Sequence, residues 1–512
     1  MKNNMNLTSL PELFIKSKEK YPEKICLEDD YGQYSYEYVY ENAIKLANLI
    51  TKKCSQTHQP IVILTDKNKD VPLIMLAIMM TRNIYVPLDK GMPKIRLNKI
   101  LKTLKPALVI HDEENSKLKK ETSIDFSEFK INNFKKKFIK KIEDNIIDKV
   151  NEIIDIDPAY IIFTSGSTGD PKGVTISHGS VIDYILWAKS VFNVKQTDSF
   201  ASQAPFHFDN SVLDIYLAFI SGAKLHIPNE IIYIFPKKTL DFLKNSKITI
   251  IFWVPSIILN IANSNLLDKY KLKLKYVIFA GEQMSVTHIN QWVKAFPKAQ
   301  YANLYGPTEI TVDCTFYKFN KRYKAKILPI GVPCNNCELT IIDKNGKIPK
   351  IGEPGELHVR GKCLSLGYWN NRKATAQAFI QNPAHDKYED IVYKTGDIVK
   401  MDKNGLIYFL NRADSQIKHM GYRIELGEIE AAALNIENIT NCAVLYDQNA
   451  KKIILCYVED GKKLFDDKKL RLDLAKKLPK YMLPRELIKL KKMPLNSNGK
   501  IDRKLLIKDL IK

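Results

Sequence analysis

Short apolar runs recur along most of the chain, with polar residues between them. The clearest runs are Pro60–Asp66 (PIVILTD), Ile84–Asp89 (IYVPLD), Ile248–Ser256 and Tyr276–Glu282. Unbroken apolar runs of this length are typical of strands that are covered on both faces. In contrast, Glu37–Ile50 places its apolar residues along one helix face. The pattern therefore predicts an α/β fold with largely parallel sheets.

The pattern changes beyond Gly396, where the elements become shorter and more charged, and Asn411–Arg423 shows no clear period. We expect a large N-terminal domain of mixed, largely parallel sheets and helices over residues 1–411, a hinge over 412–416 and a small, mobile α+β domain over 417–512.

The polar and charged segment 111–150 predicts a surface excursion, either an edge hairpin or an irregular loop. The N-terminus lacks the apolar core of a secretion signal. The longest apolar run, Ile248–Ala262, is interrupted by Pro255 and falls short of the roughly 20 residues of a membrane span. We expect a cytoplasmic protein without a membrane span.

The net charge is +22, from 79 Lys and Arg against 57 Asp and Glu. Such a charge is compatible with an acidic partner, either nucleic acid or protein, or with a solvated lysine-rich surface. The second interpretation is favoured, because the Lys, Ile and Asn bias runs along the whole chain. Nucleic-acid-binding motifs are absent from the sequence, so we expect no nucleic-acid partner.

The eight cysteines are scattered, as is typical of reduced thiols in a long cytosolic chain. Cys334 and Cys337 form one isolated C-x-x-C. A zinc site needs two further ligands at a compatible spacing, and the sequence shows no second pair. We therefore expect neither metal binding nor redox chemistry there.

A glycine-rich turn, FTSGSTGDPKGV, occupies Phe163–Val174 after an apolar strand. Glycine lets the backbone approach a bulky anion, and consecutive amide groups can form an anion nest. Polar groups come from the hydroxyls of Thr164, Ser165, Ser167 and Thr168 and the ammonium of Lys172. Neither the P-loop nor the dinucleotide fingerprint spacing is present. The turn therefore predicts a phosphate site of another kind, in preference to a flexible surface loop.

Five further motifs follow this turn: NLYGPTE (Asn303–Glu309), GELHVRGKCLSLGYW (Gly355–Trp369), YKTGDIV (Tyr393–Val399), NRADSQIKHMGYRIELGEIE (Asn411–Glu430) and PLNSNGKIDR (Pro494–Arg503). Together, and in this order, the six motifs resemble the adenylate-forming superfamily, which includes acyl-CoA ligases, luciferases and the adenylation domains of nonribosomal peptide synthesis. The resemblance covers essentially the whole chain.

The resemblance implies an ATP site. The turn, with Gly166 and Gly169, is expected to hold the β- and γ-phosphates, with Thr308 contacting phosphate and Glu309 holding Mg²⁺. The expected adenine site comprises Gly281, Glu282, Asn303 and Tyr305. Asp397 is expected to accept both ribose hydroxyls, with Arg412 nearby.

The resemblance also implies two reaction steps. In the first, ATP and a carboxylate form an adenylate and release pyrophosphate, and Lys500 is expected to bridge the carboxylate and the α-phosphate. A cation there stabilises the transition state, in which two anions meet. In the second, a thiol displaces AMP after the small domain rotates. Asp414 matches the hinge, and Lys418 and Gly421 match the second catalytic face.

The segment APFHFDNSVLDIY (Ala204–Tyr216) bears on the substrate. Asp209 fits the Phe-Asp-x-Ser pattern of amino-acid-activating members, in which a buried carboxylate pairs with the α-ammonium. The segment PFH, which contains His207, instead resembles the corresponding segment of acyl-CoA ligases. The expected side-chain pocket comprises Asn210, Leu213, Phe252, Ile278, Ala280, Leu304, Val312 and Asp313. Its bulky apolar lining favours a small side chain, while Asn210 and Asp313 leave open a small polar residue or bound water.

The sequence resembles free-standing D-alanine–carrier protein ligases most, and L-prolyl-carrier ligases as well. No carrier segment follows NGKIDR, so we expect transfer to the phosphopantetheine thiol of a separate carrier protein. The alternatives are an acyl- or aryl-CoA ligase that uses free CoA, and a degenerate nucleotide-binding protein. Two positions depart from the family pattern, because Arg82 and Asn411 stand where glycine is usual.

Overall fold

The computed structural model describes residues 7–112, 122–126, 129, 136–166, 170–413, 416–448, 450–459, 466–494 and 501–511, with the backbone alone at 136–141 and 504. The chain divides into two units. The first comprises Met1–Lys90, Leu104–Ile162 and Gly173–Asn411, and the second comprises Gly91–Thr103, Phe163–Lys172 and Arg412–Lys512.

A nine-stranded sheet forms the largest layer of the first unit. Its order is β15 (Val332–Pro333), β14 (Thr315–Phe319), β13 (Gln300–Tyr305), β12 (Tyr276–Phe279), β11 (Ile250–Trp253), β9 (Ser199–Ala201), β10 (Lys224–Ile227), β1 (Ile25–Asp29) and β2 (Gly32–Ser35). The strands from β13 to β1 are parallel, and antiparallel strands flank them at both ends. The central apolar runs therefore form parallel strands, as predicted.

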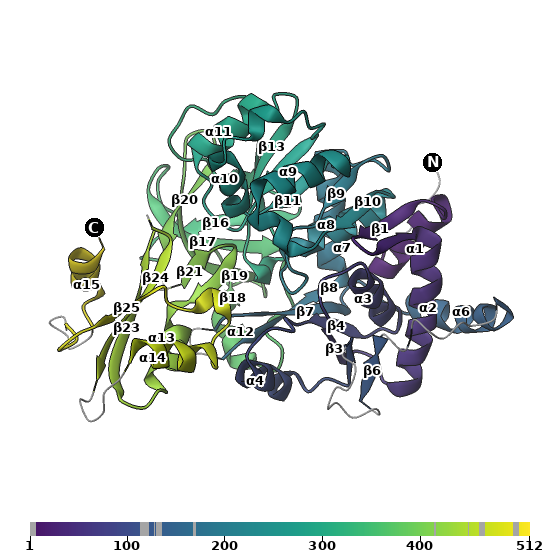
Figure 1. The fold of residues 1–512 in the computed structure, drawn as a ribbon, viewed down its shortest axis with the longest axis horizontal. Helices are drawn as coiled ribbons and strands as arrows, with labels where there is room; N and C mark the ends of the chain where they lie inside the picture. The colour runs from purple at the N-terminus through teal and green to yellow at the C-terminus, as the bar shows by residue number, and fades with distance from the viewer. Residues whose placement is uncertain are drawn as a thin grey trace. The chain divides into compact units, whose positions relative to one another are not determined.

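Alternate residues of the central strands pack into two separate apolar cores. Phe252, Ile278 and Leu304 belong to the core that contains α7 (His178–Phe192) and α8 (Asn210–Ser221). Trp253, Phe279 and their neighbours belong to the opposite core. That core contains α9 (Pro236–Asn245), α10 (Pro255–Asn263) and α11 (Val286–Ala295), which lie beside β11 and β13 in Figure 1. Burial on both faces explains why these strands are apolar throughout.

A second sheet has the order β6 (Ser123–Asp125), β5 (Leu108–His111), β3 (Pro60–Leu64), β4 (Ile84–Pro87), β7 (Pro158–Thr164) and β8 (Lys172–Ser177). The helices α1 (Leu10–Lys20), α2 (Tyr36–Lys53) and α3 (Asp70–Met80) belong to the same unit. Every residue of α3 is buried, as expected for a helix that is apolar all round.

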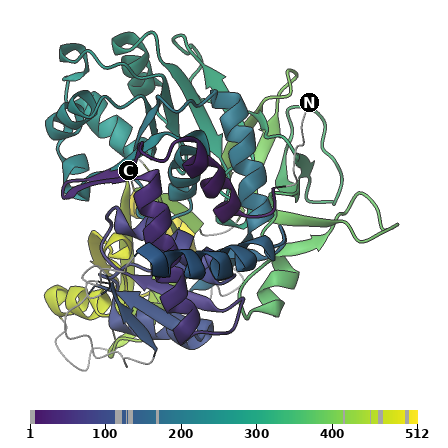
Figure 2. The same ribbon diagram turned by 90° about the vertical axis from the view of Figure 1, so that its right-hand side faces the viewer.

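The expectation of a hairpin or irregular loop over 111–150 is wrong for most of its described part. Helix α6 (Lys136–Asn151) lies against α2 (Figure 1 and Figure 2). Its residues Ile142, Ile146 and Val150 are buried. Their spacing of four places them on one helix face. The many lysines around them concealed this apolar stripe in the sequence.

Arg82 shows why glycine is usual at its position. Its φ is +59°, in the left-handed region that glycine adopts most easily. The guanidinium makes ion pairs with Glu152, at 2.7 Å, and with Asp157, at 3.5 Å. These contacts favour the left-handed conformation despite its cost. Asn411, the other departure, lies within β20 (Ile407–Arg412).

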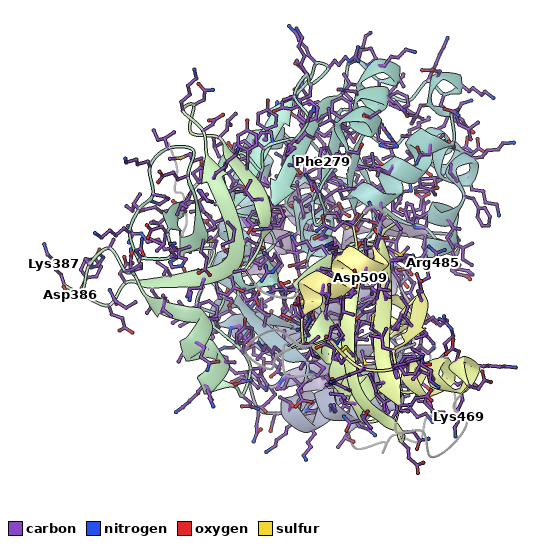
Figure 3. All side chains as sticks on the ribbon, turned by 90° about the vertical axis from the view of Figure 1, so that its left-hand side faces the viewer. Phe279, Asp386, Lys387, Lys469, Arg485 and Asp509 are labelled. Carbon is purple, nitrogen blue, oxygen red and sulfur yellow. The ribbon has the colours of Figure 1, made fainter. Side chains whose placement is uncertain are left out.

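A third sheet of the first unit has the antiparallel order β16 (Cys337–Ile342), β17 (Pro354–Gly361), β19 (Ile391–Met401) and β18 (Phe379–Gln381), with β20 also paired to β19. Helix α12 (Arg372–Ala378) precedes β18. The loop between β18 and β19 carries Asp386 and Lys387 outward into solvent (Figure 3).

The second unit contains α4 (Lys94–Leu104, except its last residue), the hairpin β21 (Gln416–His419) and β22 (Tyr422–Glu425), and the sheet β23 (Ile439–Asp447), β24 (Lys452–Glu459) and β25 (Glu486–Lys489). Leu455 of β24 faces a core with α13 (Leu426–Leu434) and α14 (Asp467–Ala475). The next residue, Cys456, faces α15 (Arg503–Leu510). The predicted fold class, a large α/β part and a small α+β part, is confirmed.

The hairpin turn accounts for Gly421 structurally. His419 pairs with Tyr422, so Met420 and Gly421 form a two-residue turn in which both φ angles are positive, at +53° and +82°. This is the turn that favours glycine in a tight hairpin. None of the described helices is long and apolar enough to span a bilayer.

Acid should destabilise the first unit through His178, which begins α7. The side chain is 1% exposed, and its Nδ1 accepts a hydrogen bond from the Leu10 amide at 3.3 Å. Burial lowers the pKa of His178 to about 4. Between about pH 6.5 and this value the unfolded chain binds a proton that the folded chain does not, so stability rises with pH in this window.

His178→Gln should therefore weaken the pH dependence. As the pH falls from 6.5 to 4, the wild-type free energy of unfolding should decrease by about 3 kcal/mol more than that of the variant. Urea unfolding followed by tryptophan fluorescence measures this, because all four tryptophans lie in the first unit. Parallel pH profiles for the two proteins would contradict the prediction.

Candidate active site

The carboxyl ends of β11, β12 and β13 lie at one edge of the large sheet. Trp253 pairs with Phe279, and Phe279 with Asn303, so the three strands run side by side in register. Polar segments follow β12 and β13 at this edge, where open parallel sheets generally bind ligands. The predicted residues Gly281, Glu282, Thr308 and Glu309 all lie in these segments.

After β12 the chain turns at Gly281, whose φ is +92°. A Cβ at Gly281 would lie 3.9 Å from the side-chain amide nitrogen of Asn210, at the start of α8. The Glu282 carboxylate accepts a hydrogen bond from the Ser256 amide, at 3.0 Å, in the first turn of α10. A helix N-terminus favours such a negative charge. The structure thus brings Asn210, Gly281 and Glu282 together.

The segment after β13 folds back tightly. A Cβ on Gly306 would lie 2.4 Å from the Val312 carbonyl oxygen and 2.5 Å from the Asp313 Cα, so only glycine fits. Thr311 and Val312 are both left-handed, with φ of +58° and +72°. Such strained backbone often marks functional sites. The fold-back buries Thr308 and Glu309, which lie in η3 (Thr308–Ile310).

Tyrosine hydroxyls hold three buried carboxylates of the first unit. Tyr368 donates to Glu309 at 2.8 Å, and Tyr184 donates to Asp313 at 2.7 Å. Tyr305 donates to Asp397, which is 2% exposed. A hydroxyl satisfies one carboxylate oxygen without bringing a positive charge of its own. These carboxylates therefore suit ligands that carry hydroxyl groups or positive charge.

Glu309 was predicted to hold Mg²⁺, and this role stays a prediction. Its side chain offers hard oxygen ligands, and it is 1% exposed. Among the described residues, no group of three or more His, Cys, Asp and Glu is arranged to hold a metal. A cation at Glu309 would therefore take further ligands from a bound phosphate, as Mg²⁺ commonly does.

Asp397 contacts one of the predicted adenine residues, Tyr305 at the end of β13. The amide of Asp397 donates to the Thr395 hydroxyl at 3.0 Å, and that hydroxyl donates to the Leu357 carbonyl at 2.7 Å. The side-chain amide of Asn303 donates to the Pro329 carbonyl at 2.8 Å. Each of these side chains thus has a defined orientation beside the ends of the central strands.

The residues predicted to line the side-chain pocket gather in one core of the first unit. The apolar members belong to this core and are fully buried: Leu213, Phe252, Ile278, Ala280, Leu304 and Val312. Burial chiefly raises the pKa of Tyr184, with further contributions from Asp313, which its hydroxyl contacts at 2.7 Å, and from the charge of Asp209. The same core thus contains the apolar residues and Tyr184, which links Asp313 to them.

A model of the AMP-binding enzyme family matches residues 14–369, and a model of the AMP-binding enzyme C-terminal domain matches residues 428–500. The chain belongs to this family. Family membership confirms the resemblance to adenylate-forming enzymes that the six motifs indicated.

Relatives of this AMP-binding enzyme include much longer proteins. Bacitracin synthase 3 of Bacillus licheniformis is 31% identical over 500 residues, which are 97% of this chain and 8% of that protein. Tyrocidine synthase 1 of Brevibacillus parabrevis is 30% identical over 508 residues, 97% of this chain and 45% of that protein. The chain thus spans less than half the length of these curated relatives.

Two solved structures share the fold. One is holo-PA1221, an NRPS protein containing adenylation and PCP domains, with a TM-score of 0.83, 20% identity, and coverage of 98% of this chain and 84% of that chain. The other is o-succinylbenzoate CoA synthetase of Bacillus subtilis, with a TM-score of 0.82, 18% identity, and coverage of 97% and 98%. The fold therefore does not distinguish a carrier-dependent enzyme from a CoA ligase.

In the second unit, the described part of the glycine-rich turn is tightly folded. A Cβ on Gly166 would lie 2.1 Å from the Asp170 carbonyl oxygen and 3.5 Å from the Lys172 Cε. The Ser165 hydroxyl donates to the Arg423 carbonyl at 2.8 Å. Lys172 therefore lies beside the turn that it was predicted to serve.

The remaining predicted residues of this AMP-binding enzyme lie in strands or outside the residues that the structure describes. Thr164 ends β7, Arg412 ends β20, and Lys418 pairs with Arg423 in the β21–β22 hairpin. Five predicted residues lie outside the described residues: Ser167, Thr168, Gly169, Asp414 and Lys500. The roles assigned to all these residues stay predictions.

Sequence reasoning missed Tyr184 and Tyr368. Tyr184 lies 129 residues from Asp313, and Tyr368 lies 59 residues from Glu309. Tyr368 belongs to the motif that ends in GYW, which marked the segment without assigning the residue a role. No signal in the sequence pointed to Tyr184.

Tyr305→Phe should destabilise this AMP-binding enzyme, because it removes the hydroxyl that donates a hydrogen bond to the buried Asp397 carboxylate. The expected decrease in the free energy of unfolding is about 1–3 kcal/mol. Urea unfolding followed by tryptophan fluorescence measures it. The matched control is Tyr388→Phe on the outward loop of Figure 3, where the side chain is 62% exposed and the change should stay within about 0.5 kcal/mol. Equal effects for both variants would contradict the prediction.

Proposed function

We propose that the protein activates a small amino acid with ATP, forming an aminoacyl-AMP and releasing pyrophosphate. It then transfers the aminoacyl group to the phosphopantetheine thiol of a carrier protein. The proposal rests chiefly on Asp209, a carboxylate beside the apolar core that holds the predicted side-chain pocket. The likeness of this chain to synthases of bacitracin and tyrocidine supports it.

Asp209 stands at the N-cap of α8 but makes no side-chain capping bond there. Burial is the main cause that raises the pKa of Tyr160 and Tyr184, and the charge of Asp209 raises both pKa values further. Asp209 thus lies near two buried phenols. An α-ammonium group beside Asp209 would gain both an ion pair and hydrogen bonds.

We infer the size of the substrate from the residues predicted to line the side-chain pocket. Leu213, Phe252 and Ile278 are fully buried and bulky, so a small amino acid fits the same face best. The Asp313 carboxylate accepts a hydrogen bond from the Tyr184 hydroxyl. This contact supports a structural role for Asp313, a polar residue in an otherwise apolar set. We propose an enzyme of the D-alanine- or L-proline-type class.

The nucleotide roles follow the motifs. The Phe163–Val174 turn and Lys172 would bind the β- and γ-phosphates, and Asp397 would accept the ribose hydroxyls. Glu309 would hold Mg²⁺, whose charge offsets that of the phosphates. Lys500 would stabilise the negative charge that develops between the carboxylate and the α-phosphate.

The second step would use the C-terminal part of the chain. We propose that the chain comprises a large domain over 1–411, a hinge over 412–416 around Asp414, and a mobile domain over 417–512. Lys418 and the hairpin turn at Gly421 would face the site during thiol transfer. Because chemistry and transfer need different arrangements of one site, rotation would separate the two reactions.

The first test is pyrophosphate exchange with each of the twenty L-amino acids, D-alanine, and a set of aryl and fatty acids. We expect exchange with one or a few small amino acids, followed by thioester formation when a phosphopantetheinylated carrier protein is added. Exchange with aryl or fatty acids alone, and thioester formation with free CoA, would instead establish the CoA ligase that His207 suggests.

Asp209→Asn should impair amino-acid use selectively, since it keeps the shape of the side chain and removes its charge. With the amino acid found above, KM should rise about 100-fold or more, as expected when a buried ion pair loses one partner, while the KM for ATP should change little. Pyrophosphate exchange at varied concentrations of each substrate measures both constants.

The matched control for this prediction is Asp386→Asn, on the outward loop of Figure 3. It removes the same charge from a solvated position and should leave both constants unchanged. Equal losses toward amino acid and ATP in Asp209→Asn would exclude the ammonium-binding role.

A further inference from the structure

The segment that leads to Asp209 is held at its start by one lysine. Lys67 follows β3, and its ammonium group donates to the Ser202 carbonyl at 3.1 Å and to the Gln203 carbonyl at 2.9 Å. These two acceptor residues directly follow β9. Since β3 and β9 belong to different sheets of the first unit, Lys67 joins the ends of two strands that do not pair with each other.

Further contacts fix the Lys67 side chain, which is 8% exposed. Its ammonium nitrogen lies 5.5 Å from the centre of the Phe206 ring and 4.0 Å from a carboxylate oxygen of Glu230. The Tyr233 hydroxyl donates to the same Ser202 carbonyl at 2.9 Å. An ammonium group held by carbonyl oxygens and a ring face has a defined position.

The Lys67 side chain keeps its charge at neutral pH. Burial lowers its pKa to about 8, and the charges of Glu230 and Asp214 act in the opposite direction. The ammonium form therefore predominates at pH 7. A charged donor makes stronger hydrogen bonds than a neutral one, so the two carbonyls are held firmly.

The chain between Lys67's contacts and α8 is short and hydrogen-bonded. We call residues 202–209 the recognition loop. Within it the Phe208 amide donates to the Pro205 carbonyl at 3.0 Å, and the Ser211 hydroxyl of α8 donates to the Phe208 carbonyl at 2.6 Å. Lys67 thus holds one end of the recognition loop and α8 holds the other, with Asp209 at the junction with the helix.

We propose that Lys67 is a positioning residue for amino-acid recognition, because it holds the recognition loop and so sets the place of the Asp209 carboxylate. The inference rests on the proposed function, in which Asp209 pairs with the α-ammonium group of the substrate. Lys67 acts through Asp209 in this role. A small misplacement of a binding group can cost up to about 100-fold, so releasing one end of the loop should weaken use of the amino acid.

A lysine that bonds main-chain carbonyls can also serve stability alone, and Lys189 offers the comparison. Its ammonium group donates to the Ile220 carbonyl at 2.7 Å, near the far end of α8. Burial lowers the pKa of Lys189, as it does that of Lys67. The two lysines therefore make similar contacts at opposite ends of α8, and they separate a role in recognition from a role in stability.

The test uses Lys67→Met, which removes the ammonium group and keeps an unbranched side chain of similar length. In hydrogen–deuterium exchange of the whole protein, peptides that cover the recognition loop should exchange about 10-fold faster than in the wild type. In pyrophosphate exchange with the amino acid identified by the first test, KM for the amino acid should rise about 10-fold. The kcat and the KM for ATP should change less than about 2-fold, because the recognition loop holds the ammonium-binding carboxylate and not the nucleotide residues.

Lys189→Met is the matched control. It should lower the midpoint of urea unfolding without changing the exchange of the recognition loop or the KM for the amino acid. If Lys67→Met does not fold, Lys67→Gln, which is neutral and shorter, takes its place with the same expected results.

Unchanged hydrogen exchange in the recognition loop would overturn the proposal. Faster loop exchange with an unchanged KM for the amino acid would overturn it as well, and so would equal rises in this KM for the Lys67 and Lys189 variants. The hydrogen-exchange measurement needs no substrate. If the wild type uses only aryl or fatty acids, the proposed function fails by itself, and the loop measurement still decides whether Lys67 holds the loop.

Discussion

The site depends on three adjacent parallel strands, β11, β12 and β13, that are buried on both faces. Burial requires each strand to be apolar and to place alternate side chains in two different cores. The parallel register then brings the three carboxyl ends to one edge of the sheet. Gly281, Glu282 and Glu309 share this edge for that reason, and Phe252, Ile278 and Leu304, one on each strand, share one core.

The polar part of the site follows a second rule, in which a tyrosine hydroxyl satisfies a buried carboxylate. Glu309, Asp313 and Asp397 are each held in this way, by Tyr368, Tyr184 and Tyr305. Leaving such a buried group without a hydrogen bond would be costly. The tyrosines bring no positive charge, which keeps the arrangement compatible with a metal ion or a substrate hydroxyl as ligand.

Several sequence predictions followed directly from local physics. The apolar runs Ile248–Ser256 and Tyr276–Glu282 contain β11 and β12, and the helical pattern of Glu37–Ile50 lies within α2. Segment 111–150 was harder, because lysines outnumber the few apolar residues that form the buried stripe of α6. For Arg82, the sequence showed only that arginine stands where glycine is usual. The structure adds that the backbone there is left-handed and that the side chain makes two ion pairs.

By itself the sequence determined the superfamily, the order of its motifs and the strands and helices that carry them, because each of these is encoded in a short segment. Only the tertiary structure decided which side chains meet. Tyr305 and Asp397 are 92 residues apart, and Tyr184 and Asp313 are 129 apart. Such contacts depend on how whole sheets pack, and no local pattern of residues contains that information.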